Sequence, residues 1–117
     1  MVQVEFMVGL TLNRWNHMAQ EAQTEIIKSL VDVDRADCLD VANNVQVFNR
    51  FIMEAHKVVD RGRTHYSART IGEVIRHETA LQDDKKSFKI NNNLFPKLAR
   101  VSMSIFPALN GLFELRG

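Results

Sequence analysis

The chain has 117 residues, 45% of them hydrophobic and 25% charged, with a formal net charge of +1. These values predict a single soluble domain that can bury its own core. The one cysteine excludes an intrachain disulfide framework, and no apolar run approaches the ~20 residues that a membrane-spanning helix needs. The N-terminus lacks the basic start and apolar core of a secretory signal, so we expect a cytoplasmic protein with no membrane partner.

Charge is distributed unevenly along the chain. Residues 1–56 carry four basic and eight acidic side chains, a net charge of −4, whereas residues 57–117 carry eleven basic and six acidic ones, a net charge of +5. Such asymmetry is found where one half of a protein meets an anion, and a chance imbalance on a solvated surface is the alternative. Because the whole chain is nearly neutral, attraction to DNA would have to come from a local basic patch.

The N-terminal third begins with an alternating pattern. Residues 2–12 place apolar side chains at period two, which predicts a half-buried strand. Asn13 is the expected cap of a first helix, whose apolar side chains recur at helical spacing: Trp15, Met18, Ala22, Ile26 and Leu30. Residues 31–40 are acidic and only loosely periodic, and we interpret them as a connector.

A second helix is marked more clearly. Asn43 or Asn44 can cap it, and a broad apolar stripe runs over residues 45–59. Gly62 follows where a residue of left-handed conformation would end the helix. The pattern therefore predicts a helix of about four turns.

The third helix follows a short extended link at residues 63–66. Ser67 is its expected cap, and its apolar pattern ends near Leu81. Residues 82–86, "QDDKK", are typical of a polar turn, and residues 87–90, "SFKI", are interpreted as a short strand.

Asn92 or Asn93 is the expected cap of a fourth helix. Its apolar stripe consists of Leu94, Leu98, Val101 and Ile105. Pro107 should stop this helix, residues 110–111 should form a turn, and residues 112–116 should form a terminal strand. The resulting fold class is mainly α (α+β): one small helical domain over residues 1–117 with short β elements. The side chains expected to be buried include Phe48, Phe51, Ile52, Ile71, Ile75, Leu98, Val101 and Phe113.

No catalytic signature is found in the chain. It contains no phosphate-binding glycine loop, no nucleophile elbow and no paired Cys/His zinc spacing. Cys38 has no local sequence support as a nucleophile, and we interpret it as a buried or idle thiol. We therefore expect no enzyme activity, no cofactor and no metal site.

Basic residues gather at two places in the second half of the chain. One group surrounds the start of the third helix, and the other precedes and enters the fourth helix next to three asparagines. Lysine and arginine neutralise phosphates, and asparagine can pair with an adenine edge. The candidate nucleic-acid-binding residues are Arg61, Arg63, Arg69, Lys89, Asn91, Asn92, Lys97 and Arg100. The alternative is that the asparagines only cap the helix and that the charges only provide solubility.

Residues 45–116 resemble a group of small phage and prophage proteins of unassigned function. The shared pattern is Arg-Gly-x-x-x-Tyr/Trp-Ser, an Ile-Arg pair, Phe-Lys-x-Asn-Asn, Ala-Arg-x-x-Met and Phe-Glu-x-Arg. It falls here on Arg61, Gly62, Tyr66, Ser67, Ile75, Arg76, Phe88, Lys89, Asn91, Asn92, Ala99, Arg100, Met103, Phe113, Glu114 and Arg116. The resemblance implies a protein that works in a phage-infected host cell.

The order of the expected elements also resembles a winged-helix domain. By this analogy, residues 45–117 form a winged-helix-like core and residues 1–44 an N-terminal strand and helix extension. The connection between the third and fourth helices, near ten residues, is longer than that of a tight helix-turn-helix. Only one terminal strand follows, so there is little room for a full two-stranded wing.

Two functions follow as hypotheses. The favoured one is a phage-type nucleic-acid-binding protein, a regulator or accessory factor in DNA metabolism. The alternative is a non-enzymatic, anti-CRISPR-like inhibitor that binds a host defence protein complex. In that case the acidic half would mimic nucleic acid, through Asp32, Asp34, Asp37 and Asp40.

Overall fold

The computed structural model describes residues 10–82 and 92–114. These residues contain six α-helices and one turn of 3-10 helix, joined by loops. The elements are α2 (Leu12–Asn16), α3 (Gln20–Lys28), α4 (Arg35–Ala42), α5 (Val45–Asp60), α6 (Ala68–Gln82), α7 (Leu94–Ile105) and η1 (Pro107–Leu109). Over these ranges the chain is mainly helical, as predicted, and no helix among them is long and apolar enough to cross a membrane.

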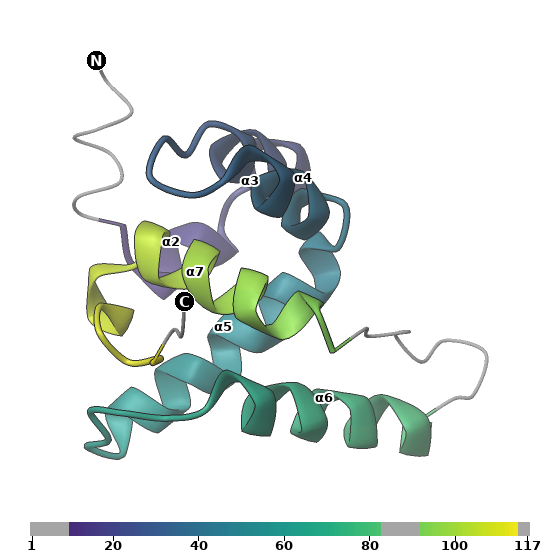
Figure 1. Cartoon of the computed structure of the whole chain (residues 1–117), viewed down its shortest axis with the longest axis vertical. Coiled ribbons are helices and arrows are strands. Elements are labelled where there is room, and N and C mark those ends of the chain that lie inside the picture. Colours follow the sequence, from purple (N-terminus) through teal and green to yellow (C-terminus); the bar gives the residue numbers. More distant parts are fainter. Residues whose placement is uncertain (1–9, 83–91, 115–117) are drawn as a thin grey trace.

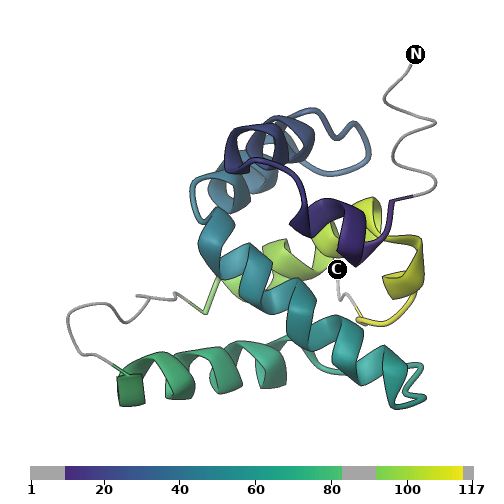
Figure 2. The same cartoon turned by 180° about the vertical axis from the view of Figure 1, so that it is seen from behind.

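Helix α5 runs through the middle of the molecule. Helices α3 and α4 pack together beyond one of its ends, and α6 lies across the other (Figure 1, Figure 2). Helix α7 lies against α5 between these two groups, so it contacts α4 on one side and α6 on the other. Helix α2 and the 3-10 helix pack against α5 as well. The position of α7 therefore connects the acidic first half of the chain with its basic second half.

The second, third and fourth helices of the sequence prediction are confirmed as α5, α6 and α7. Gly62 after α5 and Gly111 in the last turn have positive φ angles of 87° and 77°, as glycine allows. Every side chain predicted for the core is buried: Phe48, Phe51, Ile52, Ile71, Ile75, Leu98, Val101 and Phe113. One hydrophobic cluster joins them to buried side chains of α2, α3 and α4.

The prediction for the start of the chain was wrong where the structure can be compared with it. Residues 2–9 lie outside the described residues, and the hydroxyl of Thr11 caps α2 by accepting the backbone N–H of Arg14 at 3.2 Å. The single helix expected up to Leu30 is divided into α2 and α3. At the end of α2 the carbonyl of Trp15 accepts the backbone N–H of Met18 at 3.0 Å and the buried side chain of Gln23 at 2.9 Å, so α3 folds back onto α2.

Of the apolar stripe expected in this region, Trp15 is buried and Met18, Ile26 and Leu30 are partly buried against the core, but the stripe misses the residues of α3 that are fully covered. Ala22 is exposed, whereas Gln23 and Ile27 are buried. Gln23 tolerates burial because its side chain takes part in a closed polar network. In this network the indole of Trp15 donates to Asn49 at 2.8 Å and the Asn49 amide donates to Gln23 at 3.1 Å.

Residues 31–40 are not a connector, because most of them enter α4. Asp34 caps this helix by accepting the backbone N–H of Ala36 at 3.2 Å. Cys38, Val41 and Ala42 then follow at helical spacing and are buried. The eight-residue helix is too short for its three apolar positions to give a clear periodic signal.

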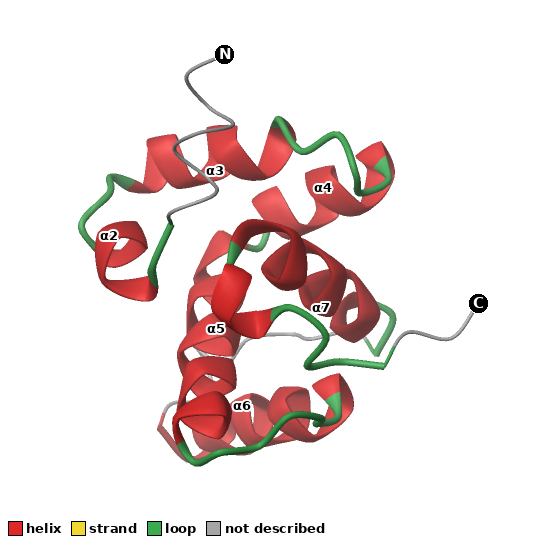
Figure 3. Cartoon of the chain, turned by 90° about the vertical axis from the view of Figure 1, so that its left-hand side faces the viewer, coloured by secondary structure: helices red, strands yellow, loops and turns green. Residues whose placement is uncertain are grey.

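Strands are absent from the described part of the chain (Figure 3). The strand expected at residues 87–90 lies outside that part, as does most of the turn before it, although Gln82 itself still belongs to α6. Of the terminal strand expected at residues 112–116, the described residues 112–114 contribute one isolated parallel bridge, between Tyr66 and Phe113, and residues 115–116 lie outside the described part. Pro107 begins the 3-10 helix, and α7 ends two residues earlier at Ile105.

Candidate nucleic-acid interface

The structure describes six of the eight candidate residues, which lie in two groups. Arg61 and Arg63 are exposed in the turn after α5, and Arg69 is exposed in the first turn of α6. Asn92 precedes α7, and the side chains of Lys97 and Arg100, on α7 itself, are 27% and 37% exposed. Lys89 and Asn91 lie outside the described residues. Of the eight, the fold brings Arg69, Asn92 and Arg100 to one cavity.

This cavity of about 640 Å³ lies between the start of α6, the start of α7 and the C-terminal segment. Its apolar lining comes from Tyr66, Ala68, Phe95 and Pro96. Its polar lining comes from His65, Ser67, Arg69, Asn92, Arg100 and Glu114. Two arginines and one glutamate leave an excess of positive charge, so the cavity combines apolar surface with donors suited to an anion.

The segment leading into the cavity is held at both ends. After α5, the backbone N–H of Arg63 donates back to the carbonyl of Val58 at 3.3 Å, a connection that the positive φ of Gly62 makes possible. At the other end, the N–H of Tyr66 donates to the carbonyl of Leu112 at 2.9 Å. The hydroxyl of Ser67 accepts the N–H of Thr70 at 3.4 Å, as a cap of α6.

The start of α7 is held by contacts with α6. The Arg76 guanidinium lies 5.3 Å from the centre of the Phe95 ring and donates to the side-chain oxygen of Asn92 at 2.9 Å. Asn93 occupies the cap position, but its side chain makes no capping hydrogen bond. The expectation of an asparagine cap is therefore confirmed in position and wrong in mechanism, because contacts with Arg76 position this end of the helix.

The basic side chains of α7 face α4. Lys97 forms an ion pair with Asp40, and Arg100 forms one with Asp37 at 3.2 Å. The hydrogen bond that Lys97 donates to the Asp40 carboxylate raises the pKa of Lys97 above its ordinary value of 10.5. A phosphate would have to compete with Asp40 for Lys97, so this lysine is a weaker candidate than the sequence suggested.

The acidic residues of the mimicry hypothesis have partners of their own. Asp37 and Asp40 pair with α7, the Asp32 carboxylate accepts the hydroxyl of Ser104 at 2.6 Å, and Asp34 caps α4. The sequence indicated an acidic surface and a separate basic surface. In the structure, Asp37 and Asp40 of the first neutralise Arg100 and Lys97 of the second where α4 contacts α7.

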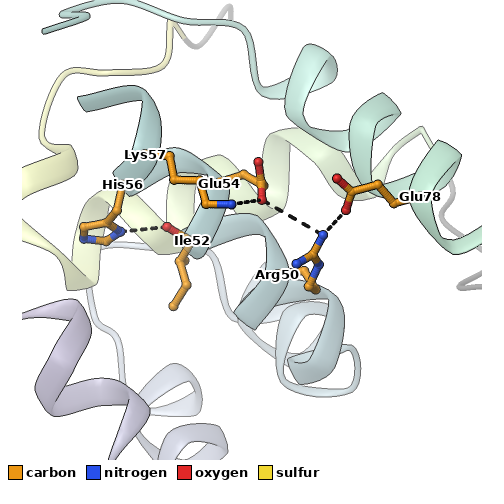
Figure 4. Close-up of polar contacts among 6 residues, drawn as sticks. All are labelled: Arg50, Ile52, Glu54, His56, Lys57 and Glu78. Atoms are coloured by element: carbon orange, nitrogen blue, oxygen red, sulfur yellow. Dashed lines mark hydrogen bonds and ion pairs between the residues drawn. The ribbon is translucent and has the colours of Figure 1, made fainter. Parts of the chain in front are cut away.

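Other cations on α5 are paired in the same way. Arg50 contacts Glu78 of α6 and lies 4.0 Å from Glu54, whose carboxylate also accepts Lys57 at 3.1 Å (Figure 4). By contrast, Arg61, Arg63 and Arg69 form no ion pair within residues 10–82 and 92–114. Among the described cations of the basic second half of the chain, these three guanidinium groups are the most available to a phosphate, because Lys57, Arg76, Lys97 and Arg100 are paired.

Sequence reasoning did not select Tyr66, Phe95 or Glu114 as site residues, although Tyr66 and Glu114 belong to the phage-protein pattern. Their positions around one cavity depend on the bridge between residues 66 and 113, which no local pattern indicates. Elsewhere, burial raises the pKa of the Cys38 thiol. No three His, Cys, Asp or Glu side chains of the described ranges lie together as a metal site would require.

Comparison of the chain with protein-family models, with curated proteins and with solved structures finds no match. What the interface can do must therefore be inferred from its own residues. Three arginines without an ion pair among the described residues, and a cavity with donors and apolar walls, suit a ligand that carries both negative charge and flat apolar surface.

Proposed function

We propose that the chain is a non-enzymatic phage-type protein that binds nucleic acid in the cytoplasm of the host cell, as a regulator or accessory factor in DNA metabolism. The observation that carries this proposal is that the exposed Arg61, Arg63 and Arg69, at the end of α5 and the start of α6, form no ion pair with the described residues and that Arg69 lines the cavity between α6 and α7. Nucleic acid is the cellular ligand that combines regularly spaced phosphates with flat apolar bases.

The electrostatics of the chain favour this segment as the point of contact. A chain with a net charge of +1 attracts polyanions only through a local excess of positive charge. Paired cations such as Arg50 and Lys97 contribute little to such a patch because their fields are cancelled by carboxylates nearby. The unpaired arginines can each replace a counterion of the phosphate backbone on binding.

The winged-helix-like arrangement of residues 45–117 belongs to this proposal as well. The order of α5, α6 and α7, followed by the bridge of Tyr66 with Phe113, is compatible with it. In that arrangement α7 would be expected to enter a major groove, but its basic face is paired with α4. The proposed contact surface is therefore the start of α6 and not the length of α7.

A salt titration tests the function. Fluorescence anisotropy would follow labelled mixed-sequence single strands and duplexes at several salt concentrations, with the wild type and with Arg61→Gln/Arg69→Gln. Each lost phosphate contact flattens the dependence of log affinity on log salt by about 0.9 for duplex and about 0.7 for single strands. For the double variant, the plot of log affinity against log salt should therefore be flatter than for the wild type by about twice these amounts.

The matched control changes two exposed cations elsewhere. Lys28→Gln/Arg35→Gln removes the same charge from α3 and α4 and should leave the slope close to that of the wild type. An equal loss of slope in both double variants would show that net charge, and not this site, attracts the nucleic acid. Absence of wild-type binding to either probe at low salt would contradict the proposed function.

Inhibition of a host defence complex is the second candidate, and exposed apolar side chains near α4 favour it. Val31 is 97% exposed and Leu39 is 38% exposed, although isolated apolar residues are common on surfaces. A pull-down from infected host lysate after nuclease treatment, with the wild type and with Val31→Ser/Leu39→Ser, tests it. Capture that survives nuclease and is lost in the variant would support an inhibitor. Capture lost with nuclease would argue against it.

A further inference from the structure

We infer that the cavity between α6 and α7 receives one unpaired nucleotide of a single strand, with its base against Tyr66 and its phosphate at Arg69 and Arg100. This inference rests on the proposed function and narrows it from nucleic acid to single-stranded nucleic acid. It is carried by the size of the cavity, by the partial exposure of Tyr66 and by the hydrogen-bonding capacity left on the two arginines.

Size comes first. The volume of about 640 Å³ lies within the range of roughly 300–1,000 Å³ that is usual for sites of small organic ligands. A single nucleotide is a ligand of this kind, whereas the base pairs of a duplex stay stacked inside the double helix. A base can enter the cavity only when it is unpaired.

The aromatic residues differ in how much ring they can offer to a base. Phe95 is 3% exposed and already lies under the Arg76 guanidinium. Tyr66 is only partly buried, and its backbone is fixed by the hydrogen bond to Leu112. Stacking on aromatic side chains is a usual way in which proteins hold unpaired bases without reading their sequence. Tyr66 is therefore the residue on which a base would stack.

The two arginines of the cavity can hold the phosphate together. Arg69 is exposed and forms no ion pair with the described residues. Arg100 uses its Nη1 atom to contact Asp37, and a guanidinium has five N–H donors. Arg100 can thus keep its contact with Asp37 and still donate to a phosphate, with Asp37 acting as a positioning residue.

Glu114 adds a negative charge to the lining of the cavity. Its carboxylate lines the same cavity and opposes negative charge there. Replacing it by glutamine removes this repulsion with little change in shape. Glu114→Gln is consequently expected to bind a single strand more tightly than the wild type, which a merely structural role of the segment would not produce.

The test compares affinities for three labelled probes: a mixed-sequence 12-mer, its duplex, and the same 12-mer with abasic positions. We expect the wild type to prefer the intact single strand over both others. Tyr66→Ala should weaken single-strand binding by about tenfold to a hundredfold, the range expected for loss of base stacking, and Tyr66→Phe should restore most of it. The abasic probe should bind wild type and Tyr66→Ala almost equally.

A second measurement uses the wild-type sequence, so its result does not depend on whether a variant folds. The chain has one tyrosine, so 3-fluorotyrosine gives a single ¹⁹F resonance that reports on residue 66 alone. This resonance should shift with the intact single strand and much less with the abasic strand. Duplex binding as tight as single-strand binding, or equal shifts with both strands, would overturn the inference and leave the proposed function standing. Loss of all nucleic-acid binding would overturn both.

Discussion

Gly72 of α6 and Phe95 of α7 meet where the two helices cross, and only a residue without a side chain fits at this point. A Cβ atom at position 72 would lie 2.3 Å from Cε1 of the Phe95 ring. The ring has little room to move, because it is 3% exposed and lies under Arg76. The close approach of the helices also shapes the cavity, which Phe95 lines.

Gly72→Ala should therefore lower the free energy of unfolding, although alanine is the better helix former. Overpacking of a core typically costs about 1–3 kcal/mol, which outweighs a gain in helix propensity of up to about 1 kcal/mol. Urea denaturation measures the difference. Thr70→Ala, at an exposed position of the same helix, is the control and should not destabilise. A stabilised Gly72→Ala would mean that the helices can separate at no cost.

The polar network of Trp15, Gln23 and Asn49 should behave as a unit. Asn49→Ala removes the acceptor of the Trp15 indole and the donor to Gln23, both of which are buried. Leaving a buried polar group unsatisfied costs about 1–3 kcal/mol, and we expect a loss within or above that range. In a double-mutant cycle with Gln23→Leu, the two losses should not add, because each variant breaks the same network. Strict additivity would contradict this view.

The ion pair of Asp37 with Arg100 should form again when the two residues are exchanged. Asp37→Arg places two cations together at the contact of α4 with α7 and should destabilise the fold, more strongly at low salt than at high salt. Asp37→Arg/Arg100→Asp restores opposite charges and should recover part of the loss. Pairs near the surface contribute about 0.2–1 kcal/mol, so the recovery is expected to be of that size. Thermal unfolding at two salt concentrations measures it.

Cys38 should make stability depend on pH in alkaline solution. Burial raises the pKa of this thiol above its ordinary value of 9.0, so the native state keeps the proton after the unfolded chain has lost it. The native state then binds more protons, and the free energy of unfolding falls as the pH rises through 9. Urea denaturation at pH 8 and pH 10 should show a larger loss for the wild type than for Cys38→Ala.

The ion pair of Lys97 with Asp40 remains intact over the pH range of this comparison. The pKa of Lys97 is raised above 10.5, so its contribution is lost only at higher pH and is present in both proteins throughout. Equal losses for the wild type and Cys38→Ala would contradict a thiol kept neutral by burial. A rapid reaction of the native thiol with a disulfide reagent at pH 8 would contradict it independently.

The sequence by itself determined the elements whose pattern is long and regular. The apolar stripes of α5, α6 and α7 predicted both these helices and the side chains that they bury. Gly62 and Gly111 marked their turns because few other residues adopt a positive φ. Each of these signals lies within one helix or one turn, where hydrophobic spacing alone reports which face is covered.

Only the tertiary structure decided what the polar residues do. Lys97 and Arg100 have the spacing of a free basic face, yet their partners lie 57 and 63 residues earlier, on a helix that its own short pattern did not reveal. Gln23 looks like a surface residue until Trp15 and Asn49 satisfy it in the core. Charge and hydrogen-bond partners depend on which surfaces meet after distant segments pack. For that reason Arg61, Arg63 and Arg69 stood out from Arg50, Lys97 and Arg100 only once the fold had paired those three with carboxylates.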